Sequence, residues 1–143
     1  MIGAGYVFVL AVEAGQMVQC AIGAARSPID RAIDLLDSRS RPAVLAYSRI
    51  GTLRRAARVR IDLRAVLNPW HSRGCWFEVP LTDGPQFRDA VRKTIDRYER
   101  GGMAIETHHI DMAAYFASRR RASLAVRRRF TASVGAIKYR AST

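Results

Sequence analysis

The sequence has little cysteine and no long hydrophobic run. Its two cysteines, Cys20 and Cys75, stand far apart and lack the CxxC spacing of zinc ligands, which predicts two reduced thiols and no metal site. The apolar stretch 2–12 is too short to span a membrane and lacks the basic start of a signal peptide. These absences predict a cytoplasmic protein that holds no metal or other cofactor.

Lysine is scarce as well, although the chain is strongly basic. Of the 24 basic residues only Lys93 and Lys138 are lysines, so 22 are arginines, and the formal net charge is +12. Positive potential of this size favours nucleic acid, acidic proteins or anionic membranes as partners. A GC-rich genome would also enrich arginine, but guanidinium groups grip phosphates bidentately whatever the cause of their abundance.

The first part of the chain predicts a β-hairpin, a helix and a third strand. Residues 5–12 and 17–22 are rich in β-forming side chains, and a glycine between them suits a turn. Ser27 and Pro28 are typical of a helix start, and residues 43–50 are typical of a strand. The expected apolar stripe of the helix consists of Ile29, Ala32, Ile33 and Leu36.

An arginine-rich segment in the middle of the chain predicts a second helix. Apolar residues recur at helical spacing over residues 53–65, and Asn68-Pro69 ends the helix because proline cannot donate the next backbone hydrogen bond. The expected apolar stripe consists of Leu53, Ala57, Ile61 and Ala65. Residues 75–79 (CWFEV) then predict a strand, and residues 85–100 predict a third helix.

The pair Gly101-Gly102 is the predicted domain boundary. Residues 1–100 are predicted to form an α/β domain with a small central mixed or antiparallel sheet flanked by helices. Residues 103–143 are predicted to form a basic helical extension, with a helix over residues 110–130. No acidic residue follows Asp111 in this extension. It carries two arginine triplets, namely Arg119, Arg120 and Arg121, and Arg127, Arg128 and Arg129.

The two triplets have three interpretations. Without intervening acids they repel one another unless a polyanion is present, which favours nucleic acid. A solvated helix face is the alternative that assigns them no function. Binding to a membrane surface is the third interpretation, because Tyr115, Phe116, Leu124 and Phe130 give the helix a partial apolar face.

Several short motifs occur in a fixed order before the glycine pair: GYVFVL at residues 5–10, AIG at 21–23, Arg31 in the first helix, RIDLR at 60–64 and GCWFEV at 74–79. In this order and spacing the chain resembles the GIY-YIG nuclease superfamily over residues 5–98. It is most similar to the branch typified by certain phage reading frames and fungal meiotically up-regulated proteins. This resemblance implies a small sheet flanked by helices and an ancestral DNA-cleaving site.

The resemblance also locates the positions at which this chain departs from active nucleases. In active members a tyrosine hydroxyl and an arginine act near a water nucleophile, and a glutamate holds one divalent metal. Phe8 stands at the tyrosine position and has no proton to move. Arg60 stands at the glutamate position and cannot ligate Mg²⁺, and Arg64 replaces a histidine. Only Arg31 survives of the catalytic set.

Two pairs of neighbouring residues have both a structural and a functional interpretation. Trp76 and Phe77 are predicted to be core residues, with the alternative that one of them lies at a cleft edge and stacks on a base. His108 and His109 point in different directions on any regular element and have no acidic or cysteine partners at ligand spacing. A surface or packing role is therefore predicted for them in preference to metal binding.

The sequence as a whole predicts a catalytically degenerate, nuclease-like domain that binds duplex or branched DNA as a regulator of transcription or an architectural factor of the nucleoid. The predicted DNA-binding residues are Arg31, Arg60, Arg64 and the two triplets. One alternative is an active metal-dependent endonuclease that uses Tyr6 and Arg31. A second alternative is a protein–protein adaptor whose basic tail docks on an acidic partner. Besides DNA, the expected partners are another protein or a second copy of the chain, and no membrane.

Overall fold

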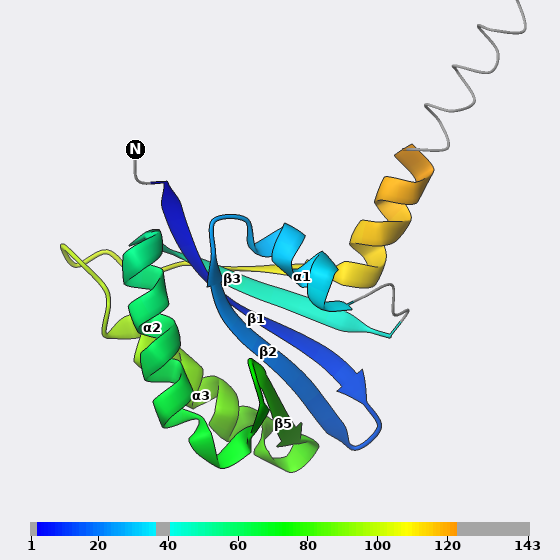
Figure 1. The fold of residues 1–143 in the computed structure, drawn as a ribbon, viewed down its shortest axis with the longest axis horizontal. Coiled ribbons are helices and arrows are strands. Elements are labelled where there is room, and N and C mark those ends of the chain that lie inside the picture. Colours follow the sequence, from blue (N-terminus) through cyan, green and yellow to red (C-terminus); the bar gives the residue numbers. More distant parts are fainter. Residues whose placement is uncertain (1–2, 37–40, 123–143) are drawn as a thin grey trace, which may run out of the picture. The chain divides into compact units, whose positions relative to one another are not determined.

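The computed structural model describes residues 3–36 and 41–122, and it divides into two compact units, Met1–Asp111 and Met112–Thr143. Six strands of the described part form one antiparallel sheet in the order β4-β5-β2-β1-β3-β6 (Figure 1). The regular elements of the first unit are β1 (Ala4–Ala14), β2 (Met17–Ala25), α1 (Pro28–Leu36), β3 (Ala43–Thr52), α2 (Leu53–Val66), β4 (His71–Arg73), β5 (Trp76–Pro80), α3 (Gly84–Asp96) and β6 (Thr107–Asp111). The predicted α/β class and sheet flanked by helices are confirmed.

The centre of the sheet is the predicted hairpin of β1 and β2, which turns at Gly15 with a φ of 69°. On its other side β1 pairs with β3, and the register shifts between Gly5 and Tyr6. At Gly5 the backbone of the β3–α2 junction comes so close that a Cβ would lie 2.3 Å from the Thr52 carbonyl oxygen. Only glycine fits there, which explains the first residue of the GYVFVL motif.

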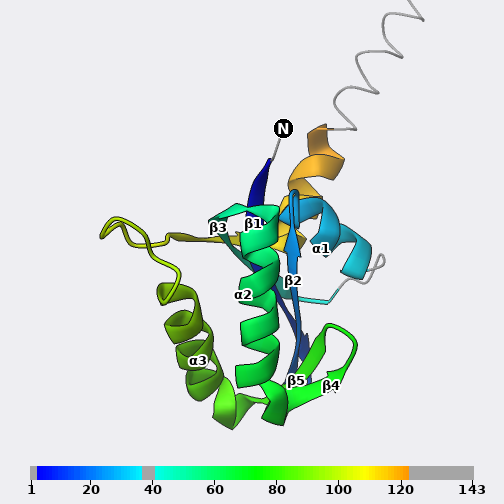
Figure 2. The ribbon, with the colours of Figure 1, turned by 60° about the vertical axis from the view of Figure 1, so that its left-hand side comes forward.

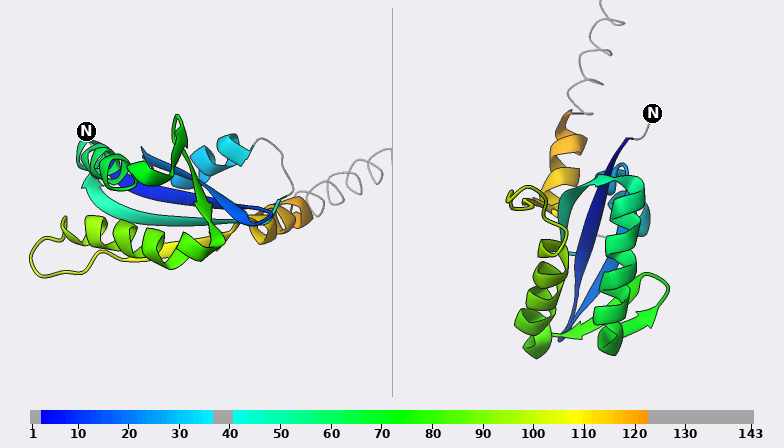
Figure 3. Two further views of the ribbon diagram at one scale, coloured as in Figure 1. Left: turned by 90° about the horizontal axis from the view of Figure 1, so that it is seen from below. Right: turned by 90° about the vertical axis from the view of Figure 1, so that its left-hand side faces the viewer.

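Helices α2 and α3 pack together on one face of the sheet (Figure 2). Their buried side chains join a core to which β1 contributes Val7 and β5 contributes Phe77. Successive strand residues point to opposite faces, so Phe8 and Leu10 lie on the other face. Helix α1 covers that second face, and Figure 3 shows α1 and α3 on opposite sides of the strands. The sheet therefore separates α1 from α2 and α3.

The apolar stripe predicted for the arginine-rich helix is wrong by a rotation about the helix axis. The residues of α2 that are buried are Ala56, Val59 and Leu63, whereas Ile61 is 59% exposed. Both sets of residues recur at helical spacing, so periodicity alone could not separate them. Leu67 continues the observed set and is fully buried. It follows the last residue of the helix and precedes Asn68-Pro69.

The predicted domain boundary is also wrong. Gly101 and Gly102 have φ angles of 63° and 72° and form a tight turn that bridges Arg100 and Met103. The chain then returns to the sheet, where β6 pairs with β3, so the first unit continues to Asp111. Ile110 and Asp111 are strand residues, and the helix predicted from residue 110 begins at residue 112.

His71 begins the short strand β4, and its ring lies edge-on to Phe77 with centroids 5.4 Å apart. Throughout residues 3–36 and 41–122, no helix combines the length and the apolar character that a membrane crossing requires.

Candidate nucleic-acid interface

A basic cavity of about 400 Å³ lies where β3 ends and α2 begins. The connection from α3 to β6 forms its other wall. Three arginines, Arg49, Arg55 and Arg100, line the cavity together with His108, and Glu106 is the acidic residue among its lining. The cavity is therefore positively charged, in agreement with the sign of the whole chain.

Arg55 is held in place by interactions on both of its ends. Its backbone N–H donates to the Thr52 hydroxyl at the start of α2, 3.2 Å away. Its guanidinium Nη2 donates to the Tyr98 carbonyl at 2.6 Å, and its Cζ lies 5.2 Å from the centroid of the Tyr98 ring. The Tyr98 hydroxyl in turn donates to Asp62, and this hydrogen bond is the largest cause that raises the pKa of Tyr98. These contacts tie α2 to the end of α3 and fix one wall of the cavity.

A row of aromatic rings adjoins the cavity on the face of the sheet that carries Phe8. Tyr6 of β1 and Tyr47 of β3 meet edge-on with centroids 5.9 Å apart, and His108 of β6 lies 5.3 Å from Tyr47. Arg49 is the register partner of Tyr6. The tyrosines are half-buried, and His108 and Arg49 are exposed.

The cavity and the row form one continuous surface because Arg49 and His108 belong to both. We call it the basic aromatic surface. It consists of Tyr6, Tyr47, Arg49, Arg55, Arg100 and His108. Guanidinium groups bind phosphate oxygens through charge-assisted hydrogen bonds, and aromatic rings stack on bases. Within the described residues, no group of three or more histidine, cysteine, aspartate or glutamate side chains could hold a metal ion.

Three of the predicted DNA-binding residues, Arg31, Arg60 and Arg64, do not lie together. Arg31 is exposed on α1. Arg60 is exposed on α2, which packs on the other face of the sheet, and Arg64 of the same helix donates from Nη1 to the Asn68 side chain at 2.8 Å. These three arginines therefore do not share one surface. Whether each arginine binds DNA individually stays a prediction.

Phe8 occupies the hydrophobic interior. It is 2% exposed, and its ring lies so close to Gly23 that a Cβ there would be 2.6 Å from the Phe8 Cζ atom. The AIG motif therefore supplies the space that this ring fills. Tyr6, two residues earlier, lies on the same face of the sheet, but it belongs to the aromatic row.

The first arginine triplet lies in the second unit, in the helix over residues 112–122. Arg119, Arg120 and Arg121 are all exposed. Arg119 Nη1 donates to the Tyr115 hydroxyl at 3.4 Å, and its Cζ lies 5.6 Å from the centroid of that ring. The second triplet, Arg127, Arg128 and Arg129, lies outside the described residues.

Sequence reasoning missed most of the basic aromatic surface. The alternation of Tyr47 and Arg49 along β3 was a usable signal, since it places both side chains on one face. Their proximity to Tyr6 could not be inferred, because it depends on the pairing of β1 with β3. The contact of His108 with Tyr47 could not be inferred either, because it requires β6 to join the sheet.

Comparisons with known proteins add no relative: no family model matches the chain, and no curated protein or solved structure does. The geometry of the basic aromatic surface is therefore the basis for assigning a function.

Proposed function

We propose that this protein binds nucleic acid through the basic aromatic surface and does not cleave it. The observation that carries the proposal is the continuity of the arginine-lined cavity with the row of rings, through Arg49 and His108. A nucleic-acid strand presents phosphates and bases side by side, so a ligand of this kind contacts both parts at once.

Branched or partly unpaired DNA suits this surface better than a uniform duplex. Bases in a duplex are stacked on one another and leave no face for Tyr6 or Tyr47, whereas bases at a junction or in a single strand are accessible. The arginines of the cavity follow the backbone without reading sequence. We therefore propose a role at DNA branches or open regions in the cytoplasm, as an architectural or regulatory protein of the nucleoid.

Descent from a GIY-YIG-like nuclease remains part of the proposal. It is supported by the order of elements from β1 to α3, which is the order that the motifs imply, with β4 as an addition. Loss of catalysis is supported by the chemistry of Phe8 and Arg60. Asp62, the carboxylate nearest to Arg60 along α2, accepts the hydrogen bond from Tyr98, so it is already engaged.

The test compares DNA shapes by fluorescence anisotropy, using single-stranded, duplex and three-way-branched oligonucleotides of equal length. We expect Tyr47→Leu to weaken binding of single-stranded and branched DNA by roughly 5- to 150-fold, the usual range for one base–aromatic stack. The duplex serves as the matched control, because its affinity should change much less. Equal losses for all three shapes, with folding verified by circular dichroism, would contradict base stacking at this surface. Mg²⁺-dependent cleavage by the unmodified protein would contradict the loss of catalysis.

A further inference from the structure

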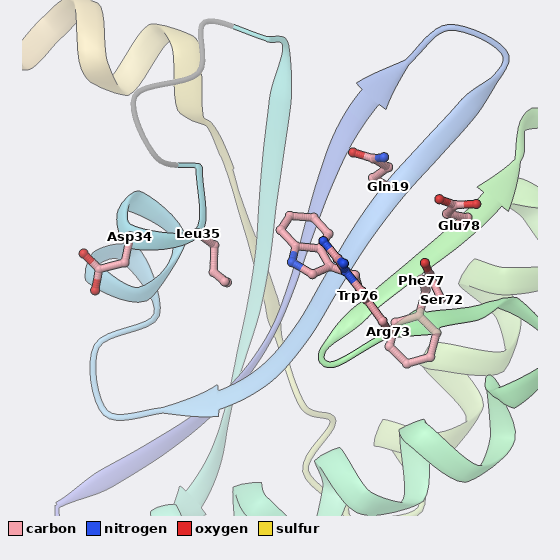
Figure 4. A pocket seen from close by; sticks show the side chains of 8 residues that line it. All are labelled: Gln19, Asp34, Leu35, Ser72, Arg73, Trp76, Phe77 and Glu78. Atoms are coloured by element: carbon pink, nitrogen blue, oxygen red, sulfur yellow. The ribbon is translucent and has the colours of Figure 1, made fainter.

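A second cavity, of about 640 Å³, lies between α1 and the hairpin of β4 and β5 (Figure 4). Its walls come from α1, β2, β4 and β5, and it shares no residue with the basic aromatic surface. The volume falls within the range of about 300–1,000 Å³ that small-molecule sites occupy. We call this cavity the Trp76 cleft.

Trp76 stands in the middle of this cleft, because strand alternation turns it away from the core. Its neighbours Phe77 and Val79 are 1% and 2% exposed in the core, so Trp76 and Glu78 point to the opposite face. The register partner of Trp76 on β2 is Ala21, whose small side chain leaves space beside the indole. Figure 4 shows the ring between Leu35 of α1 and the hairpin.

The two tryptophans of the chain differ in a way that points to a ligand. Trp70 is half-buried too, but it donates from Nε1 to the Asp83 carboxylate at 3.0 Å and meets Phe87 edge-on. Trp76 is half-buried, and its Nε1 has no hydrogen-bond acceptor among the described residues. Of the two predicted core aromatics at 76 and 77, only Phe77 is a core residue.

The polar groups around Trp76 include hydrogen-bond donors, hydrogen-bond acceptors and charges of both signs. Gln19 faces Glu78 across the β2–β5 pair, and Ser72 and Arg73 come from β4. None of these four side chains makes a hydrogen bond or ion pair with another described residue. The charges of Arg73 and Glu78 balance, and the carboxylate of Asp34 points away from Trp76 (Figure 4). Such a set favours a flat neutral ligand that both donates and accepts hydrogen bonds, and it disfavours a free anion.

We infer that the Trp76 cleft binds a nucleobase, stacked on the indole ring. An exocyclic amino group of the base can donate to Glu78, and its ring nitrogens or carbonyls can accept from Gln19, Ser72 or Arg73. The inference deepens the proposed function and rests on it: the cleft is a second site at which an unpaired base of the bound nucleic acid is held.

The experiment uses the fluorescence of Trp76 as its readout. In the full-length variant Trp70→Phe, Trp76 is the only tryptophan. Adenosine, cytidine, guanosine and thymidine are added separately, with ribose as the control for the sugar. We expect at least one nucleoside to quench the emission and ribose to leave it unchanged. Because a nucleoside carries no phosphate, this quenching should not depend on salt.

A second measurement uses single-stranded oligonucleotides and the variant Trp76→Ala in the otherwise native chain. We expect affinity to fall by roughly 5- to 150-fold, as for the loss of one stacked base. If no nucleoside quenches Trp76 and the folded variant binds oligonucleotides as tightly as the native protein, the cleft is not a base site. Quenching by ribose equal to that by nucleosides would equally overturn the inference.

The two proposals fail in distinguishable ways. Oligonucleotide binding that is sensitive to Tyr47 but indifferent to Trp76 would refute the Trp76 cleft and leave the proposed function standing. Quenching by nucleosides in a protein that binds no oligonucleotide would refute the proposed function and leave the cleft as a site for free nucleosides.

Discussion

The salt dependence of binding gives the sharpest quantitative test of the basic aromatic surface. Arg49, Arg55 and Arg100 line its cavity. If each neutralises one phosphate of a single strand, together they contribute about −2.1 to the slope of log K against log salt, at about −0.7 per contact. The double variant Arg49→Ala, Arg100→Ala should therefore have a slope shallower by about 1.4. Arg55 is kept because it also binds the Tyr98 carbonyl.

This change is large enough to measure by anisotropy. Between about 50 mM and about 200 mM salt, a slope difference of 1.4 makes the loss of affinity about 7-fold smaller for the variant than for the native protein. Arginines elsewhere in the chain contribute to both proteins, so their effect cancels in the comparison. The matched control is Arg41→Ala, Arg54→Ala, which removes the same charge at two exposed positions outside the surface. Equal changes of slope in the variant and the control would refute a localised phosphate site.

Three other predictions test the fold and its chemistry. Leu63→Ala should lower the free energy of unfolding by about 2–5 kcal/mol, because Leu63 is fully buried. Ile61→Ala should change it by no more than about 0.5 kcal/mol, because Ile61 is 59% exposed, and urea denaturation of both variants checks the orientation of α2. Burial raises the pKa of the Cys20 thiol from 9.0 to about 12, so the folded protein should resist alkylation at Cys20 at pH 8, which mass spectrometry after iodoacetamide treatment checks. The free energy of unfolding should fall as pH rises from 9 towards 12, because only the unfolded state loses the thiol proton in this range, and denaturation at several pH values checks this. A chain that ends at Asp111 should keep its sheet and its cooperative thermal transition, whereas a chain that ends at Gly102 loses β6 and should melt at a lower temperature. Identical melting curves of the two chains would show that β6 does not contribute to thermal stability.

Local patterns in the sequence were sufficient for the elements with strong boundaries. The turn at Gly15, the helix start at Ser27 and Pro28, and the stop at Asn68-Pro69 all depend on backbone chemistry within a few residues. The Ser27 hydroxyl donates to Asp30 at 2.8 Å in the first turn of α1. Such signals do not require knowledge of what the element packs against, and each of these boundaries was predicted correctly.

The errors arose where partners far apart in the sequence decide the outcome. The buried face of α2 is set by contact with residues such as Val7 and Phe77, and not by the periodicity of the helix itself. The φ angles of a glycine pair are the same whether the pair ends a domain or turns the chain back into its sheet. The boundary was therefore decided by the pairing of β6 with β3, which the sequence does not show. The candidate site was missed for the same reason, since its rings come from β1, β3 and β6.

The position of β6 also determines when the basic aromatic surface is complete during folding. The β1–β2 hairpin closes over a turn at Gly15, but the β3–β6 pair joins distant segments: Ser48 and Thr107, whose hydroxyls are 2.9 Å apart, are separated by 59 residues. Closing such a long loop costs more entropy than closing a hairpin, so we expect β6 to dock late in folding. During synthesis His108 leaves the ribosome after the other five strands have been made. The ordered row of rings on which the proposed function depends thus exists only in the completed sheet, and partly folded chains have exposed arginines without it.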